Sequence, residues 1–169
     1  ILSISNDNYN NLWIGGKSPN GFIQIYNIVN GSVDIFDYGL TEITDFWISD
    51  SIAFASFIDG QDLGIIKWVY SYGQWSYRDI YRNFPIELGS INGIAVIKNS
   101  VFLGTNNGLL TINISSNLKD PNNWSIAFND FNGLINAMCE VDDGIVFNQN
   151  NSLYRIFFNN INIQYEQLD

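Results

Sequence analysis

A short apolar run that recurs four times constrains the fold more than any other feature of this chain. The runs start at residues 12, 52, 101 and 145: Leu12-Trp13-Ile14-Gly15, Ile52-Ala53-Phe54-Ala55, Val101-Phe102-Leu103-Gly104 and Ile145-Val146-Phe147-Asn148. Before each of the last three stands a similar triplet: Ile43-Thr44-Asp45, Ile91-Asn92-Gly93 and Ile135-Asn136-Ala137. A spacing of about 40 to 50 residues is typical of proteins that repeat one supersecondary unit.

Each run is followed by two more segments with the composition of β-strands. The first set is Gly21 to Tyr26, Gly64 to Tyr70, Gly108 to Ile114 and Ser152 to Phe158, and the second is Ser32 to Tyr38, Gln74 to Tyr81, Asn123 to Asn129 and Asn160 to Gln167. Four short strands per repeat predict an all-β fold, a β-propeller built from four-stranded antiparallel blades, with four blades' worth of chain. Neighbouring blades would cover both faces of each sheet, which explains why the runs are almost continuously apolar.

The two ends of the chain suggest how the repeats are completed. We treat residues 1–169 as a single β-propeller domain or propeller segment, in which Ile1 to Ser5 is an outer strand that completes the C-terminal blade. One alternative is a closed four-bladed ring. The other is a fragment of a larger ring, which would expose sheet faces and edges and is expected to form homo-oligomers.

Two segments carry a family resemblance. LSISNDNYNNLWIGG at residues 2–16 resembles the repeat of the two-component regulator propeller family, in which an apolar-Ser-Ile strand and a polar turn precede Asn-Leu-Trp-Ile-Gly-Thr. VFLGTNNGLLTIN at Val101 to Asn113 resembles the second half of that motif, whereas Ala55-Ser56 and Asn148-Gln149 depart from it. The resemblance implies a ring that usually has seven blades. It also implies a bacterial extracytoplasmic sensor or surface protein, either periplasmic or secreted to the cell surface.

The charge balance excludes several classes of partner. Seventeen acidic and seven basic residues give a net charge of −10, so the chain offers no basic cluster for nucleic acid or for an anionic membrane surface. No apolar run is long enough to span a bilayer, so we expect no membrane insertion by this segment. The single cysteine, Cys139, lies in an apolar strand and is expected to be buried.

The sequence gives no catalytic or metal-binding constellation. The absence of histidine removes Ser-His-Asp, Cys-His and histidine-ligated metal mechanisms. The acidic turns Asp59-Gly60-Gln61-Asp62 and Asp142-Asp143-Gly144 lack the distal glutamate of a calcium loop, so we interpret them as solvated turns. We therefore assign no catalytic residue, metal or cofactor and predict that the chain is not an enzyme. A glycoside hydrolase is an alternative, but the facing carboxylate pair it needs cannot be located from the sequence.

The second repeat is rich in aromatic residues, which have two interpretations. Trp68 and Tyr70 alternate on one strand, Tyr72 lies in a turn, and Trp75 lies on the next strand. These residues could pack between blades, as we also expect for Trp13 and Trp47, or they could form a surface on which a sugar stacks. Trp68, Tyr70, Tyr72 and Trp75 are therefore the candidate ligand-binding residues, with a carbohydrate or a protein as the ligand.

Three functions are consistent with these observations. The first is a non-enzymatic ligand-binding or sensor module, which the resemblance places in a bacterial extracytoplasmic protein. The alternative is a secreted or surface-associated protein-interaction scaffold. An enzyme that acts on a polysaccharide is the third.

Overall fold

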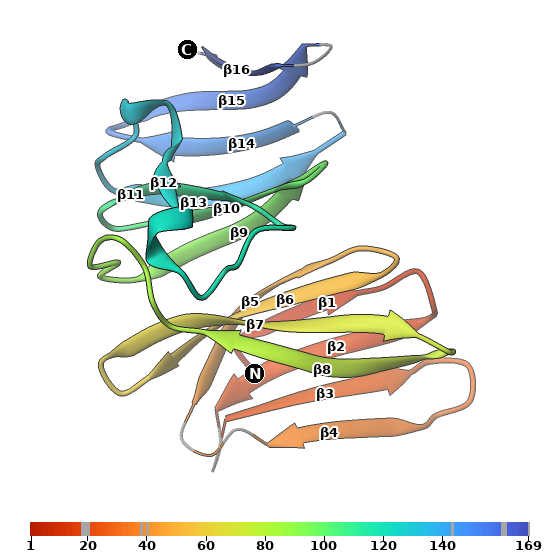
Figure 1. Ribbon diagram of the computed structural model, residues 1–169. Helices are drawn as coiled ribbons and strands as arrows, with labels where there is room; N and C mark the ends of the chain where they lie inside the picture. Colours follow the sequence, from red (N-terminus) through yellow and green to blue (C-terminus); the bar gives the residue numbers. More distant parts are fainter. Residues whose placement is uncertain (18–20, 38, 40, 143, 160–161, 169) are drawn as a thin grey trace. The chain divides into compact units, whose positions relative to one another are not determined.

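The computed structural model describes residues 1–17, 21–37, 39, 41–142, 144–159 and 162–168 (Figure 1). The chain divides into two compact units, Ile1–Arg82 (unit 1) and Asn83–Asp169 (unit 2), and each is described by itself. Each unit contains two antiparallel four-stranded sheets whose strands follow one another in chain order.

Unit 1 contains sheets 1 and 2. Sheet 1 consists of β1 (Ser3–Asn6), β2 (Asn11–Lys17), β3 (Gly21–Asn27) and β4 (Val33–Asp37). Sheet 2 consists of β5 (Glu42–Ile48), β6 (Ile52–Asp59), β7 (Asp62–Ser71) and β8 (Gln74–Tyr81). Strand β5 lies against β1, β2 and β3, so the core of unit 1 lies between the two sheets.

Unit 2 contains sheets 3 and 4. Sheet 3 consists of β9 (Ile91–Ile97), β10 (Ser100–Thr105), β11 (Gly108–Asn113) and the short β12 (Ser125–Ile126), which lies between two 3₁₀ turns, η1 (Pro121–Asn123) and η2 (Ala127–Asn129). Sheet 4 consists of β13 (Ile135–Val141), β14 (Gly144–Gln149), β15 (Ser152–Asn159) and β16 (Asn162–Gln167). Strand β13 lies against β9 and β10.

The predicted all-β fold of four-stranded antiparallel blades is confirmed, but the predicted blade boundary is wrong. The recurring apolar runs form β2, β6, β10 and β14, the second strand of each sheet. The segment at residues 1–5 contributes β1, which pairs with β2 of its own repeat instead of completing sheet 4. Strands adjacent in sequence and joined by a short loop pair most readily, and sheet 4 already has four strands of its own. Tyr38 and Asn160, the ends of two predicted strands, lie outside the described residues.

The recurring triplets form a β-bulge near the start of β5, β9 and β13. The register skips one residue in each strand, and the skipped residues are Thr44, Asn92 and Asn136. Each skipped side chain is hydrogen-bonded to the neighbouring strand or its turn: the Thr44 and Ser56 hydroxyls are 2.8 Å apart, and Asn92 and Asn136 donate to Asn106 and Asn148 at 3.0 Å. The bulge therefore explains why the middle position of the triplet is polar.

Glycines at the ends of the apolar runs allow the paired sheets to approach closely. A Cβ atom added at Gly15 would lie 2.6 Å from Cγ2 of Ile43 in sheet 2. The same relation recurs in unit 2, where a Cβ at Gly104 would lie 2.9 Å from Cγ2 of Ile135 in sheet 4. Each glycine therefore packs on the first isoleucine of the next repeat's triplet, where a larger side chain would not fit.

The prediction that Cys139 is buried is wrong. Its side chain is exposed, because Cys139 lies opposite Val146 and Arg155, on the face of sheet 4 away from buried Phe147 and Ile156. An apolar sequence context did not reveal which of the two faces is covered.

Candidate functional site

A polar hollow of about 180 Å³ lies in unit 1, where three connections meet. These are the β1–β2 loop, the β3–β4 turn and the β7–β8 turn. Tyr9, Tyr70 and Trp75 supply its aromatic wall. Its polar wall consists of the amides of Asn11, Asn27, Asn30 and Gln74, the Ser32 hydroxyl and the Asp34 carboxylate.

The β1–β2 loop is built around the carboxylate of Asp7, which is 7% exposed. One oxygen accepts hydrogen bonds from the backbone N–H groups of Tyr9 at 2.8 Å and Asn11 at 2.9 Å. The other accepts from the Asn11 amide at 2.8 Å and from two indoles, Trp13 at 3.1 Å and Trp75 at 2.7 Å. Because Trp13 belongs to sheet 1 and Trp75 to sheet 2, this one carboxylate connects the two sheets beside the hollow.

These hydrogen bonds also determine the charge state of Asp7. Burial alone raises the pKa of its carboxyl, but the donors on Asn11, Trp13 and Trp75 together outweigh burial and hold the pKa below its ordinary value. The carboxylate is therefore ionised at neutral pH. Both oxygens of the carboxylate are already occupied by these donors, so Asp7 acts as a structural anchor.

The aromatic wall is held in place by stacking. The ring centres of Tyr9 and Tyr70 are 3.7 Å apart and the two rings are nearly parallel, at 13°. The ring centres of Tyr70 and Trp75 are 5.2 Å apart. The Tyr9 hydroxyl donates to the backbone oxygen of Asp50 at 2.5 Å. Desolvation, followed by the charge of Asp50, raises the pKa of Tyr9 above its ordinary value, so the phenol is neutral at pH 7.

The polar wall contains both occupied and available groups. Asn27 is occupied, since its oxygen accepts from the N–H groups of Val29 and Asn30 and its nitrogen donates to Asn11 at 2.9 Å. By contrast, the side chains of Ser32, Asp34 and Gln74 make no hydrogen bond within the part of the chain that the structure describes. These three side chains are available to a ligand.

The four sequence-predicted site residues do not form one exposed surface. Tyr70 and Trp75 line the hollow. Trp68 is fully buried, with its ring 5.7 Å from that of Trp13, so the core interpretation holds for both tryptophans. Tyr72 is fully exposed at the tip of the β7–β8 turn, with a φ of 52°. Alternation places Trp68 and Tyr70 on the same face as expected, but sheet 1 covers that face and leaves only its end accessible.

Sequence reasoning missed most of the polar wall. Gln74 is separated by 40 residues or more from the other members of the wall, which are Asn11, Asn27, Asn30, Ser32 and Asp34. One signal was present, because the first repeat connects β1 and β2 through residues 7–10, whereas β9 and β10 are connected by residues 98–99. A longer loop in one repeat is typical of a site added to a repeated scaffold.

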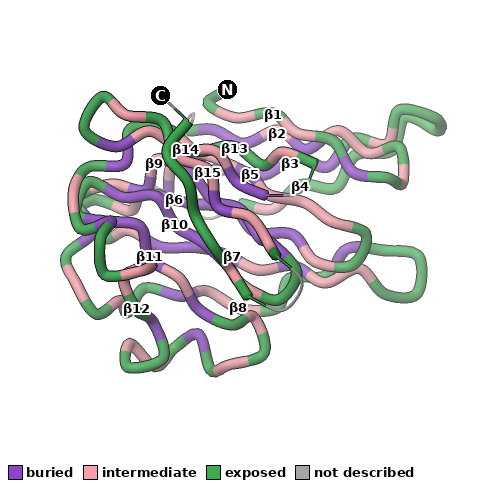
Figure 2. Tube along the Cα trace, turned by 90° about the horizontal axis from the view of Figure 1, so that it is seen from above, coloured by how far each residue is buried: buried purple, intermediate pink, exposed green. Residues whose placement is uncertain are grey.

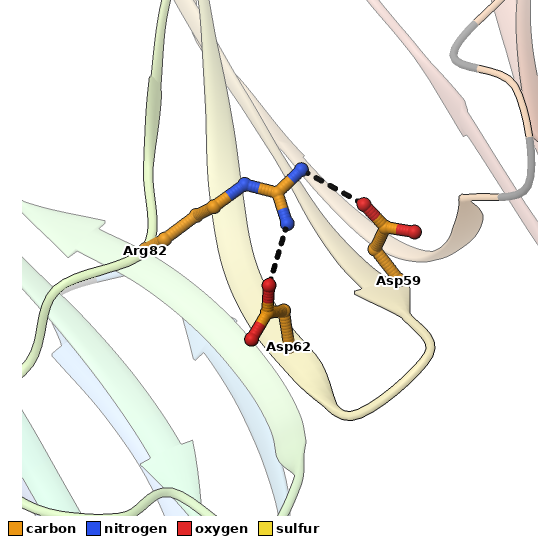
Figure 3. A network of polar contacts seen from close by, with 3 residues as sticks. All are labelled: Asp59, Asp62 and Arg82. Atoms are coloured by element: carbon orange, nitrogen blue, oxygen red, sulfur yellow. Dashed lines mark hydrogen bonds and ion pairs between the residues drawn. The ribbon is translucent and has the colours of Figure 1, made fainter.

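The acidic turn between β6 and β7 binds an arginine (Figure 3). The guanidinium of Arg82 lies 3.0 Å from Asp59 and 3.5 Å from Asp62, and 4.7 Å from the centre of the Phe57 ring. In the second acidic turn, Asp143 lies outside the described residues. Among the described residues, no three His, Cys, Asp or Glu side chains are grouped so as to hold a metal ion.

Unit 2 contains a hollow of a different kind, of about 330 Å³, at the ends of β9 and β13. Lys98, Glu140 and Asp142 line it together with Phe158. The Lys98 ammonium lies 4.1 Å from the centre of the Phe158 ring, so its cation already has a partner. The described residues that line this hollow include no side-chain amide and no stacked pair of rings, unlike those of the hollow in unit 1.

Comparison with known proteins finds similarity to solved structures and to no protein family. No family model matches the chain, and no curated protein shows a significant match. Among solved structures, the chain is similar to the N-terminal domain of Nup159, with 13% sequence identity and a TM-score of 0.42. The alignment covers 97% of this chain and 36% of that structure, so the chain spans about a third of its length. The described residues form no helix of the length and apolar character that crossing a membrane requires.

Proposed function

We propose that this chain is a non-enzymatic ligand-binding module and that the hollow in unit 1 binds one ring of a neutral saccharide. The observation that carries the proposal is the pairing of an aromatic wall, Tyr70 and Trp75, with the unoccupied polar groups of Ser32, Asp34 and Gln74. Two of these residues, Tyr70 and Trp75, are those that the sequence also suggested.

The chemistry of the hollow matches a polyhydroxylated ligand. A sugar hydroxyl both donates and accepts, and the hollow offers a carboxylate acceptor, a hydroxyl and an amide that does both. The apolar C–H face of a sugar ring can pack on the aromatic wall. None of the described residues that line the hollow is a lysine or an arginine, so an anionic ligand would meet Asp34 without a compensating charge.

The size of the hollow is consistent with a ligand that inserts a single sugar ring. A volume of about 180 Å³ corresponds to the space of about six water molecules in the liquid. That is below the range of pockets that hold drug-sized ligands. We therefore expect recognition of one terminal or accessible sugar unit.

The carboxylates support binding over hydrolysis. Glycoside hydrolysis requires two carboxyl groups that face each other across the bond to be cleaved. Among the described residues that line the hollow, Asp34 is the single carboxylate. Asp7 is close by in the loop but is committed to Trp13 and Trp75.

The biological setting is a proposal that rests on the family resemblance alone. We place the module in a bacterial extracytoplasmic protein, periplasmic or at the cell surface, where a saccharide-binding sensor would meet its ligand. An interaction scaffold is the alternative, and the exposed apolar face described below is the observation that favours it.

Isothermal titration calorimetry with free monosaccharides tests the proposal. The panel contains neutral hexoses and pentoses, with glucuronic acid as the anionic counterpart. A hexose of about 12 non-hydrogen atoms at about −0.3 kcal/mol each gives a binding free energy of about −4 kcal/mol, which corresponds to a Kd of about 1 mM. At least one neutral sugar is expected to bind in this range and glucuronic acid is not. Absence of binding by the whole neutral panel would contradict the proposal.

A matched pair of variants on β4 locates the site. Asp34→Asn removes the carboxylate that faces the hollow, and Asp37→Asn makes the same change on the opposite face of the strand. We expect Asp34→Asn to weaken sugar binding about tenfold and Asp37→Asn to leave it unchanged. Equal effects of the two substitutions would place the binding site elsewhere.

A further inference from the structure

The outer face of sheet 1, which is the face turned away from sheet 2, is apolar across all four strands. The register places Ile4, Ile14, Gln24 and Ile35 in one row, and Asn6, Leu12, Tyr26 and Val33 in the next. Residues directly opposite each other in antiparallel strands project to the same side, so these side chains form one continuous surface. Ile4 is 57% exposed, Ile35 62% and Val33 47%. Figure 2 colours the chain trace by burial, and both β1 and β4 contain exposed residues.

The inner face of the same sheet shows what covers such a surface in this chain. There Trp13, Ile23 and Ile25 are buried against Phe57, Ile66 and Trp68 of sheet 2. Sheets 3 and 4 of unit 2 pack in the same manner, with Gly104 against Ile135. In both units, the surface that covers one four-stranded sheet is therefore another sheet of the same construction.

The distribution of charge favours a second copy over a basic partner. The chain carries a net charge of −10, yet Asp37, at one margin, is the charged member among the described residues of the outer face. Two acidic chains can approach through this face with few like charges in contact. A basic protein would find few carboxylates there to pair with.

We propose that the outer face of sheet 1 is a self-association surface, through which two copies of this chain pack their first sheets face to face about a two-fold axis. Such a contact is self-complementary, because each copy presents the same apolar rows. Four strands about 4.8 Å apart and about five residues long give a face of about 19 by 17 Å. This area belongs to the class of small, transient interfaces, so we expect weak and reversible dimerisation. The hollow lies on the other side of the sheet, so this proposal is independent of saccharide binding.

Sedimentation velocity of the full chain between about 5 and 500 µM tests the proposal. The variants Ile35→Lys and Ile4→Lys place a charge on β4 and β1, at opposite margins of the face. Leu134→Lys changes a residue of comparable exposure (42%) in unit 2 and serves as the matched control. We expect a monomer–dimer equilibrium that each face variant weakens at least about tenfold, since the two-fold contact buries the added charge twice, and that Leu134→Lys leaves unchanged.

Three outcomes would overturn the proposal. A strict monomer over the whole range would mean that the face is covered from within the chain or not at all. Loss of association in Ile35→Lys but not in Ile4→Lys would indicate pairing through the β4 edge. Growth beyond a dimer would contradict a closed two-fold contact.

A measurement without substitutions covers the case in which a lysine variant does not fold. Amide hydrogen exchange of the wild-type chain is compared at about 5 µM and about 500 µM. We expect slower exchange at the high concentration in β1 to β4 and unchanged exchange in sheet 4. Equal exchange in sheet 1 at both concentrations would contradict the proposal.

Discussion

Units 1 and 2 pack their two sheets together through the same glycine–isoleucine contact but fill the space between the sheets differently. In both, a glycine at the end of the second strand packs on an isoleucine of the next sheet, Gly15 on Ile43 and Gly104 on Ile135. Unit 1 then adds a buried carboxylate, Asp7, that binds the indoles of Trp13 and Trp75. Unit 2 instead contains an apolar cluster in which Phe131 contacts the rings of Phe128, Phe147, Tyr154 and Tyr165.

The difference has a local cause and a functional consequence. The β1–β2 loop of unit 1 is long enough to fold around Asp7, whereas residues 98–99 connect β9 and β10 by a tight turn. The anchored loop brings Tyr9 onto Tyr70 and so forms a wall of the hollow. The repeat thus supplies the scaffold, and one extended loop supplies the candidate site.

The largest expected loss of stability follows removal of the Asp7 carboxylate, which distinguishes unit 1 from unit 2. Asp7→Ala leaves the two indole N–H groups and two backbone N–H groups without their acceptor. We expect a loss of about 3 to 5 kcal/mol in the free energy of unfolding. Urea unfolding followed by tryptophan fluorescence measures this loss, because four of the five tryptophans lie in unit 1. Asp120→Ala, at an exposed turn of unit 2, is the control and is expected to cost about 1 kcal/mol or less. Equal losses in the two variants would contradict the role given to Asp7.

The next largest loss of stability is expected at the glycine–isoleucine contact that both units share. Gly15→Ala introduces a Cβ atom 2.6 Å from Ile43 and 2.9 Å from Phe46, whereas Gly104→Ala introduces one 2.9 Å from Ile135. We expect destabilisation of about 2 to 3 kcal/mol for Gly15→Ala and about 1 to 2 kcal/mol for Gly104→Ala, measured by thermal unfolding. Ile43→Ala removes the Cγ2 atom of Ile43, so Gly15→Ala should cost less in the Ile43→Ala background than in the wild type. An equal cost of Gly15→Ala in both backgrounds would indicate that Ile43 is not the obstacle.

The fold was largely predictable and the site was not, for a physical reason. Strand periodicity and the spacing of the runs are local properties, so the four-stranded sheets and the burial of Trp13 follow from the sequence. The hollow depends on which turns meet when two sheets pack, and that packing brings Asp34 and Gln74 to the same hollow. Likewise, Trp68 and Tyr70 share one face and differ only in how far sheet 1 extends over them. No single-strand pattern contains that information.

The pH dependence of stability is expected to distinguish the wild type from a variant without the anchor charge. The folded-state pKa of Asp7 lies below its ordinary value of 3.8, so the contribution of its charge to stability is present above that pH and is lost as the pH falls through the folded-state pKa. The stability advantage of the wild type over Asp7→Asn should therefore shrink as the pH falls from about 5 to about 2. Urea midpoints at each pH provide the measurement. A constant difference between the two proteins would show that the charge of Asp7 does not contribute.

The smallest effect is expected at the arginine that bridges the β6–β7 turn. Arg82 and its partners Asp59 and Asp62 are all at least 35% exposed at their side chains, and solvent screens such pairs. Arg82→Met keeps an unbranched side chain but removes both ion pairs and the contact of the guanidinium with the Phe57 ring. We expect a loss below about 1 kcal/mol that disappears in about 1 M salt, measured by thermal unfolding. A larger, salt-independent loss would mean that the guanidinium is structural.

Mapping a bound sugar onto the two units tests the central claim most directly. The ¹⁵N-labelled chain is titrated with the tightest-binding neutral sugar of the panel while the side-chain amides and indole N–H groups are followed by NMR. We predict shifts of the Asn30 and Gln74 amides and of the Trp75 indole, with the Trp124 indole of unit 2 unchanged. Shifts confined to unit 2, or none at saturating sugar, would contradict the claim that the extended loop of the first repeat creates a saccharide site.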